Sequence, residues 1–190
     1  MTRAFICLFA VLALGFGGTW PSLAAGGQTP TTLTIGYIDL AKDARYRVDN
    51  AYAGIVYRTL GRPWPGAEVG IEDASMIGRV IGVKFVLDRK TAPSSDKLDA
   101  AAETLVKDGA HFILTDLPAA DLVKLADALR GQPVLLMNVS ARDDSLRGSD
   151  CRANVVHVIP SESMLTDALV QYLVARNWTH VLVLEGPAPA

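Results

Sequence analysis

The sequence predicts an α/β fold, in which a parallel sheet carries helices on both faces. The stretch from Gly66 to Asp88 first places apolar residues at helical spacing and then continues as a short run rich in Val and Phe. Helix-like and strand-like segments alternate in the same way along most of the remaining chain. A helix that leads directly into a strand is half of a βαβ crossover, and such crossovers join parallel strands.

Residues 1–25 are predicted to form a secretory signal peptide. Arg3 gives the positively charged start, residues 4–16 form an apolar core, and residues 22–25 end in two alanines that suit a cleavage site. The apolar core is shorter than the roughly 18 residues that a spanning helix needs, which makes a retained membrane anchor the weaker alternative. We therefore expect an exported, periplasmic protein without a membrane span after the signal is removed.

Charge and cysteine content exclude some classes of protein. The chain has 18 basic and 20 acidic residues, and the predicted signal contains one basic and no acidic residue, so the mature chain is weakly acidic. Such a chain is not expected to bind nucleic acid or membrane surfaces in general. Cys151 is the one cysteine outside the signal, so it cannot close an internal disulfide. We expect it to be a small buried side chain or to pair with a residue outside this sequence.

The first strand is predicted at residues 33–40. Tyr37 and Asp39 lie near its carboxyl end, where open parallel sheets bind their ligands. Both are therefore candidate ligand-binding residues. For Asp39, a role as a helix cap or turn residue is an equal alternative.

A long insert follows at residues 41–65. Ordinary connections between a strand and a helix have about two to six residues, so this insert is expected to be either functional or disordered. It concentrates arginine and aromatic side chains: Arg45, Arg47, Arg58, Arg62, Tyr46, Tyr52, Tyr57 and Trp64. Guanidinium groups bind carboxylates and aromatic rings stack on flat rings, which would suit an anionic, planar ligand held by Arg45 and Arg47. The alternative is a short helix near residues 50–60 with solvated charges.

The middle of the chain repeats the helix–strand unit. The helix that begins at Gly66 is predicted to have an acidic first turn and to end at Gly82, before a strand at residues 83–88. A second helix from Asp96 presents an apolar face formed by Leu98, Ala101, Ala102, Leu105 and Val106. A strand at residues 111–115 and another at 133–137 flank a third helix, whose predicted inward residues are Leu122, Leu125, Ala126 and Leu129.

The last part of the chain is predicted to contain a strand at residues 155–159, a helix capped by Ser161, and a strand at 180–184. The apolar stripe of that helix comprises Met164, Leu165, Ala168, Leu169, Tyr172 and Leu173. Because the final strand has no predicted neighbour, its backbone edge would be exposed. We therefore expect a signal peptide at 1–25, a first α/β lobe at 26–160, and the opening helix and strand of an incomplete second lobe at 161–190.

No arrangement of residues predicts catalysis or metal binding. Ser161, Asp167 and His157 are close in sequence, but they do not form a nucleophile elbow. The sequence also contains neither a GxGxxG motif after a strand nor a P-loop. The three histidines begin or lie within strands, where packing or capping is the expected role. We therefore expect a protein that is not an enzyme and that has no cofactor and no metal ligands.

Several segments together resemble type I periplasmic binding proteins of the Leu/Ile/Val-binding kind. The closer resemblance is to ABC-transporter substrate-binding proteins of pyrroloquinoline-quinone (PQQ)-dependent alcohol dehydrogenase systems. It covers the first lobe and the start of a second. The segments that carry it are LTIGYIDL, GAEVGIEDASMIGRVIGVKFVLD, HFILTDLPAADL, PVLLMNVSARDDSLRGSDCRANVVHVIPSESM and VARNWTHVLVLEGP.

The resemblance implies a two-lobed receptor that closes on a small molecule and presents it to an ABC permease or another periplasmic partner. By position, the ligand loops of such proteins correspond to residues 115–118 and 138–142 here, and Thr115 and Ser140 would donate hydroxyl hydrogen bonds. The resemblance thereby adds Thr115, Asp116, Asn138, Ser140 and Arg142 to the candidate ligand-binding residues. Because Asp116, Leu117 and Pro118 are not a small polar run and Arg142 is bulky and cationic, PQQ is expected as bound ligand in preference to a simple amino acid.

The predicted function is thus the periplasmic solute-binding component of an ABC-type uptake system, tied to PQQ or to alcohol oxidation. Two alternatives remain. One is a docking or sensory protein for a periplasmic quinoprotein dehydrogenase, without transport. The other is a truncated remnant without ligand binding, because half of a two-lobed cleft loses the closure on which affinity depends.

Overall fold

A computed structural model describes residues 30–46, 49–50, 56–57 and 61–184. Its main sheet has five strands in the order β4-β1-β5-β6-β7, and every neighbouring pair is parallel. This confirms the predicted fold class. The strands are β1 (Thr31–Leu40), β4 (Val83–Ala92), β5 (Phe112–Asp116), β6 (Leu135–Asn138) and β7 (Val155–His157).

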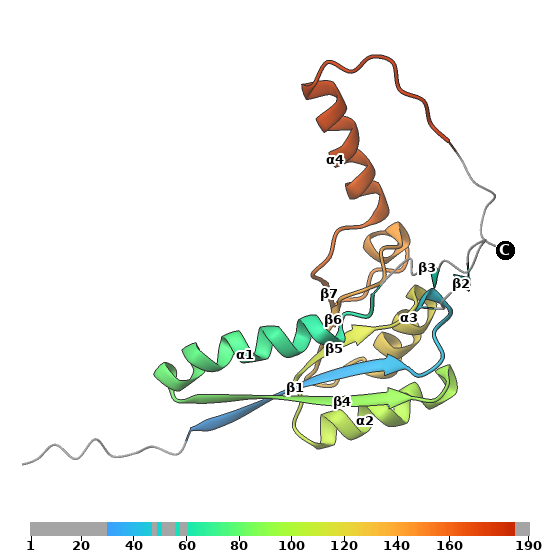
Figure 1. Ribbon diagram of the computed structural model, residues 1–190. Coiled ribbons are helices and arrows are strands. Elements are labelled where there is room, and N and C mark those ends of the chain that lie inside the picture. The colour runs from blue at the N-terminus through green and yellow to red at the C-terminus, as the bar shows by residue number, and fades with distance from the viewer. Residues whose placement is uncertain (1–29, 47–48, 51–55, 58–60, 185–190) are drawn as a thin grey trace, which may run out of the picture.

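Helices cover the two faces of this sheet (Figure 1). Helix α1 (Trp64–Ile81) lies on one face, along β1 and β4, and α2 (Leu98–Lys107) lies on the other. Helix α3 (Ala119–Ala128) shares the core on the side of α2. Short 3-10 turns precede α2 and lie in two loops: η1 (Ala44–Tyr46), η3 (Ser95–Lys97) and η4 (Asp144–Arg147).

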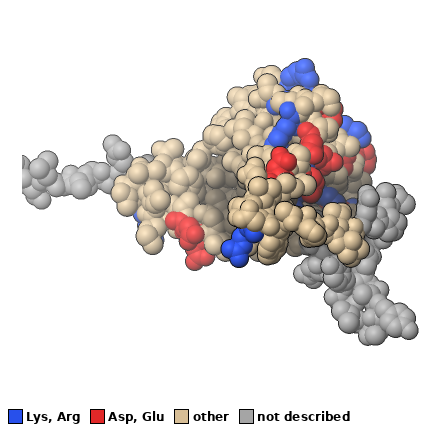
Figure 2. Space-filling model, turned by 90° about the horizontal axis from the view of Figure 1, so that it is seen from above, with Lys and Arg blue, Asp and Glu red and all other residues tan. Residues whose placement is uncertain are grey.

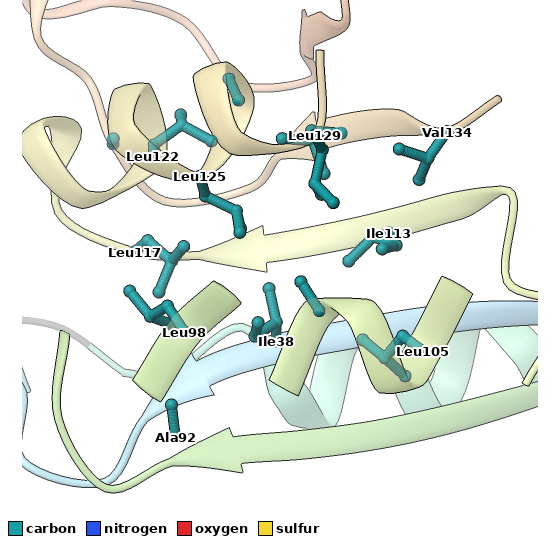
Figure 3. Packing of buried hydrophobic residues seen from close by; sticks show 14 of the residues in the cluster. Ile38, Ala92, Leu98, Leu105, Ile113, Leu117, Leu122, Leu125, Leu129 and Val134 are labelled. Atoms are coloured by element: carbon teal, nitrogen blue, oxygen red, sulfur yellow. The ribbon is translucent and has the colours of Figure 1, made fainter. Parts of the chain in front are cut away.

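The hydrophobic core lies between the sheet and the helices α2 and α3 (Figure 3). Ile38 and Ile113 contribute from neighbouring strands and are fully buried. The predicted inward residues of α3, namely Leu122, Leu125, Ala126 and Leu129, are all buried there. On α2, Leu98, Ala102 and Leu105 are buried, which confirms the predicted apolar face. Helical periodicity alone was sufficient to identify these residues because each helix has one apolar side.

Helix α1 lies against β4 through a glycine. Gly78 is buried, and a Cβ atom built there would come closer to the carbonyl oxygen of Val83 than real Cβ atoms do. The helix ends as predicted at Gly82, whose φ of 71° is left-handed. The predicted acidic first turn is wrong, because the helix begins two residues earlier, at Trp64, and the first turn contains no acidic residue.

Two predicted elements are absent from the described residues. The alternative helix near residues 50–60 is wrong, because β2 (Asp49–Asn50) and β3 (Val56–Tyr57) form a small antiparallel pair there. The strand at 180–184 is also wrong: these residues have no regular structure and no partner strand in the described part of the chain. A strand needs a neighbour to satisfy its backbone groups, whereas sequence composition reports only a tendency to extend. The strand predicted at 83–88 runs on to Ala92, because β1 pairs with it along its whole length.

Helix α4 (Glu162–Ala175) extends away from the sheet (Figure 1). Its predicted cap is confirmed, since the Ser161 hydroxyl accepts a hydrogen bond from the backbone of Met164. Its apolar stripe is not buried: Met164, Leu169 and Tyr172 are each more than half exposed. Cys151 is exposed too, so the expected burial of its side chain is wrong.

Residues 1–29, which include the predicted signal peptide, lie outside the described residues. Among the residues that the structure does describe, no helix combines the length and apolar character needed to cross a bilayer.

The glycine contact between α1 and β4 gives a matched pair of variants. We expect Gly78→Ala to lower the free energy of unfolding by about 1–3 kcal/mol, because the added methyl group meets the Val83 carbonyl. Gly70→Ala, in the same helix with open space around it, should instead raise it by up to about 1 kcal/mol through helix propensity. Urea unfolding of both variants measures the difference. Equal effects of the two changes would contradict the close contact.

Candidate functional site

The candidate site lies where the strands of the main sheet end. Asp39 of β1 and Asp116 of β5 are register partners, so their fully buried side chains stand next to each other on the α1 face. Arg89 of β4 pairs in register with Tyr37, two residues before Asp39. The ring of Tyr37 meets Trp64 of α1 edge-on, with ring centroids 5.0 Å apart.

Arginines from two directions neutralise Asp39. Its Oδ2 accepts hydrogen bonds from Arg89 at 2.5 Å and from Arg62 of the insert at 3.2 Å. The guanidinium of Arg89 also lies over the ring of Trp64, 4.7 Å from its centroid. The second oxygen, Oδ1, is buried and has no hydrogen-bond partner among the described residues.

Asp116 accepts hydrogen bonds from the insert and from β1. The hydroxyl of Tyr46 donates at 2.5 Å, Arg45 at 3.1 Å and the hydroxyl of Tyr37 at 3.3 Å. Burial, together with the negative charge of Asp116 and its hydrogen bond, raises the pKa of both tyrosines well above the usual value. Both phenols therefore keep their protons and act as donors.

Arg45 links this cluster to the loop after β6. Its guanidinium forms an ion pair with Asp43 at 2.6 Å and donates to the hydroxyl of Ser140 at 3.0 Å. Burial opposes the charge on Asp43, but the hydrogen bonds and charge of Arg45 outweigh it and hold the pKa of Asp43 below its usual value. The three aspartates and the three arginines Arg45, Arg62 and Arg89 therefore form a balanced network. We call these six residues, with Tyr37 and Tyr46, the aspartate–arginine network.

A pocket of about 460 Å³ opens beside this network. Arg45 and Tyr46 form one wall, and the loop after β6 forms another with Ser140 and Arg142. The remaining lining residues are Gly61, Pro63, Pro118, Ala119, Val139, Ala141, Asp143, Ile159 and Glu162. The nearest polar atoms of Arg142 and Glu162 are 4.0 Å apart. On the face seen in Figure 2, basic and acidic side chains lie close together over one part, and much of the remaining described surface is uncharged.

The structure divides the nine candidate residues into four groups. Three of them, Arg45, Ser140 and Arg142, line the pocket. Tyr37, Asp39 and Asp116 belong to the buried network beside it. Thr115 and Asn138 are fully buried: the Thr115 hydroxyl donates to the carbonyl of Met137, and the Asn138 amide orders the loop that follows it. Arg47 lies outside the described residues.

Four charged contributors were not among the predicted candidates: Asp43, Arg89, Asp143 and Glu162. Strand register places Arg89 beside Tyr37. The sequence pattern does not give that register, so Arg89 could not be identified before the structure was known. Tyr46 and Arg62 were recognised only as part of the composition of the insert. The described residues contain no group of three or more His, Cys, Asp or Glu side chains placed to hold a metal ion.

The network predicts a large effect of removing Asp116. We expect Asp116→Ala to cost roughly 3–5 kcal/mol of unfolding free energy, because Arg45 and two tyrosines lose their buried acceptor. Asp73→Ala, at an exposed position in α1, should change it by no more than about 0.5 kcal/mol. Urea denaturation provides the measurement. A cost for Asp116→Ala as small as that of the control would show that the network does not stabilise the fold.

Several solved structures are similar to this chain in fold. They include an ABC transporter substrate-binding protein from Desulfitobacterium hafniense, at 16% identity and a TM-score of 0.55, covering 76% of this chain and 39% of that one. A leucine-, isoleucine-, valine-, threonine- and alanine-binding protein from Brucella ovis has 15% identity and a TM-score of 0.58, covering 77% and 37%. The branched-chain amino acid transporter substrate-binding protein LivJ from Streptococcus pneumoniae, in complex with isoleucine, has 14% identity and a TM-score of 0.52, covering 70% and 35%.

The chain thus spans less than two fifths of the length of these structures. No curated protein sequence matches it significantly. The family model for periplasmic binding proteins matches residues 56–186, more than half of the chain. Together with the parallel sheet and the pocket at its carboxyl edge, this match shows that the chain belongs to the periplasmic binding protein family.

Proposed function

We propose that this chain provides the ligand-binding lobe of a periplasmic solute-binding component of an ABC-type uptake system, and that its pocket takes a small ligand with both charges, such as an apolar amino acid. The observation that supports the proposal is the mixed charge of the pocket wall. Arg45 and Arg142 face the pocket together with Asp143 and Glu162. A ligand that carries one carboxylate and one ammonium group matches such a wall better than an anion does.

The geometry removes one objection to an amino acid ligand. The sequence Asp116-Leu117-Pro118 departs from the small polar run expected in that loop. However, Asp116 and Leu117 are fully buried, and neither lines the pocket. Pro118 and Ala119, at the start of α3, line it instead. The backbone N–H groups of a helix start are suitable donors for a carboxylate.

The solved structures of similar fold support the same class of ligand. The Brucella ovis protein is described as binding leucine, isoleucine, valine, threonine and alanine. The Streptococcus pneumoniae protein was solved with isoleucine. On this proposal, the rest of such a receptor would supply a second lobe that closes over the pocket, and an ABC permease would receive the ligand.

PQQ remains the more specific expectation from the sequence resemblance. Its several carboxylates need unpaired cations, whereas Arg45, Arg62 and Arg89 are each already paired with buried aspartates. Asp143 and Glu162 would also repel it. We therefore place PQQ behind an amino acid as the proposed ligand. A docking role with a quinoprotein dehydrogenase is the second candidate function, and it is supported by the sequence resemblance alone.

Calorimetric titration of the full chain with L-leucine, L-isoleucine and PQQ tests the ligand class. We expect saturable binding of an amino acid and a rise in its Kd of about 10- to 150-fold in Arg142→Gln, because a charged hydrogen bond to a carboxylate contributes roughly 1.5–3 kcal/mol. Arg79→Gln, in an exposed part of α1, is the matched control and should leave the Kd unchanged.

The two ligand classes give opposite results in this experiment. Saturable binding of PQQ without binding of either amino acid would overturn the proposed ligand class and favour the dehydrogenase-linked interpretation. An unchanged Kd in Arg142→Gln would remove Arg142 from the site. Recovery of a periplasmic dehydrogenase in a pull-down without added ligand would favour the docking role.

A further inference from the structure

We infer that His157 is a pH-sensitive positioning residue, which acts through Asn138 to hold the pocket loop, residues 139–142, in its binding conformation. The effect on the loop follows from the hydrogen bonds alone. Its consequence for ligand affinity rests on the proposed function of the pocket.

The first step is the placement of His157 beside the pocket loop. His157 of β7 is the register partner of Asn138 of β6. Residues that are direct register partners in parallel strands project on the same side of the sheet. Asn138 is fully buried and immediately precedes the loop that carries Ser140 and Arg142.

The second step is the control that Asn138 has over the loop. Its Oδ1 accepts the backbone N–H groups of Ser140, at 3.2 Å, and Ala141, at 2.9 Å. Its Nδ2 donates to the carbonyl oxygen of Ala141 at 2.7 Å. These bonds fix which end of the amide is oxygen, since only the oxygen can accept from two N–H groups. The second hydrogen on Nδ2 is then directed to His157, with 3.0 Å between Nδ2 and the ring Nδ1.

The third step is the protonation state that this contact requires. Nδ2 of Asn138 can only donate, so Nδ1 of His157 must be the unprotonated, accepting nitrogen. The other ring nitrogen, Nε2, lies 3.2 Å from the carbonyl oxygen of Leu146 and must therefore carry the hydrogen. The two partners thus select one neutral tautomer. A proton added to Nδ1 would set two donors against each other at hydrogen-bond distance.

The charged surroundings also favour the neutral ring. Burial, and then the positive charge of Arg147 in η4, lower the pKa of His157, and the hydrogen bond to Leu146 offsets this only in part. From β6 the group that faces the ring is the uncharged amide of Asn138, and from η4 the facing groups are Arg147 and the Leu146 carbonyl. Because the folded pKa is lowered, this contribution to stability is present above the unfolded value of about 6.5 and is lost as the pH falls through the folded pKa.

The same contacts connect the loop to the start of α4. Leu146, which accepts from His157, belongs to η4 together with Asp144. Asp144 in turn accepts the backbone N–H and the hydroxyl of Ser163 in the first turn of α4. In the pocket loop, the hydroxyl of Ser140 accepts a hydrogen bond from the guanidinium of Arg45. Protonation of His157 would therefore loosen the pocket wall on the side where α4 leaves the sheet.

NMR of the ¹⁵N-labelled full chain tests the inference without any ligand. Between about pH 8 and about pH 5, we expect the backbone amide signals of Ser140 and Ala141 to titrate with the midpoint of the His157 ring. In His157→Gln, whose side chain can both accept and donate but cannot titrate, this titration should disappear. His111→Gln is the matched control and should preserve the titration. His111 precedes the first residue of β5, at the amino ends of the strands, and contacts the carbonyl oxygen of Pro133 there.

A second arm measures the consequence for ligand affinity. L-leucine should bind the wild-type chain about tenfold more weakly at about pH 5 than at about pH 8, whereas His157→Gln should show less than about a twofold change. The inference is overturned if the Ser140 and Ala141 amides do not follow the His157 ring in the wild-type chain, a result that requires no variant to fold. If the amides do follow the ring but L-leucine does not bind at any pH, the proposed function fails and the positioning role stands.

Discussion

The candidate site depends on two buried carboxylates that lie side by side and must be neutralised by nearby arginines. Asp39 and Asp116 are fully buried on neighbouring parallel strands, where two like charges without compensation would be unstable. Compensation comes from β4 through Arg89 and from the insert through Arg45 and Arg62. Arg45 and Arg62 thereby attach the described parts of the insert to the carboxyl ends of β1 and β5.

The aspartate–arginine network also sets the charge of one wall of the pocket. Its arginines have aspartate partners, so the wall that they form with Tyr46 and Ser140 carries little net charge. On the function proposed above, the selectivity of the pocket would then depend on Arg142 and Glu162, which also line it and have opposite charges.

The loop after β6 joins this base to the part of the chain that leaves the sheet. Asn138 shapes the loop, His157 holds Asn138, and η4 connects both to the first turn of α4. Helix α4 itself exposes apolar side chains such as Leu169 and Tyr172 over most of its surface. The first turn of α4 is hydrogen-bonded to η4 through Ser163 and Asp144 and to the loop after β6 through the backbone of Glu162 and Arg142.

The sequence by itself determined the elements whose signals are local. Helical periodicity identified the buried faces of α2 and α3, Gly82 and Ser161 marked helix ends, and the alternation of helix and strand predicted the parallel sheet. Only the tertiary structure showed that Tyr37, Asp39 and Asp116 belong to one buried network, because strand register brings together residues that are far apart in sequence. It also decided that residues 180–184 do not form a strand, since a strand depends on a neighbour and not on its own composition. Local patterns record the preferences of a segment, whereas ion pairs and strand pairing are properties of two segments at once.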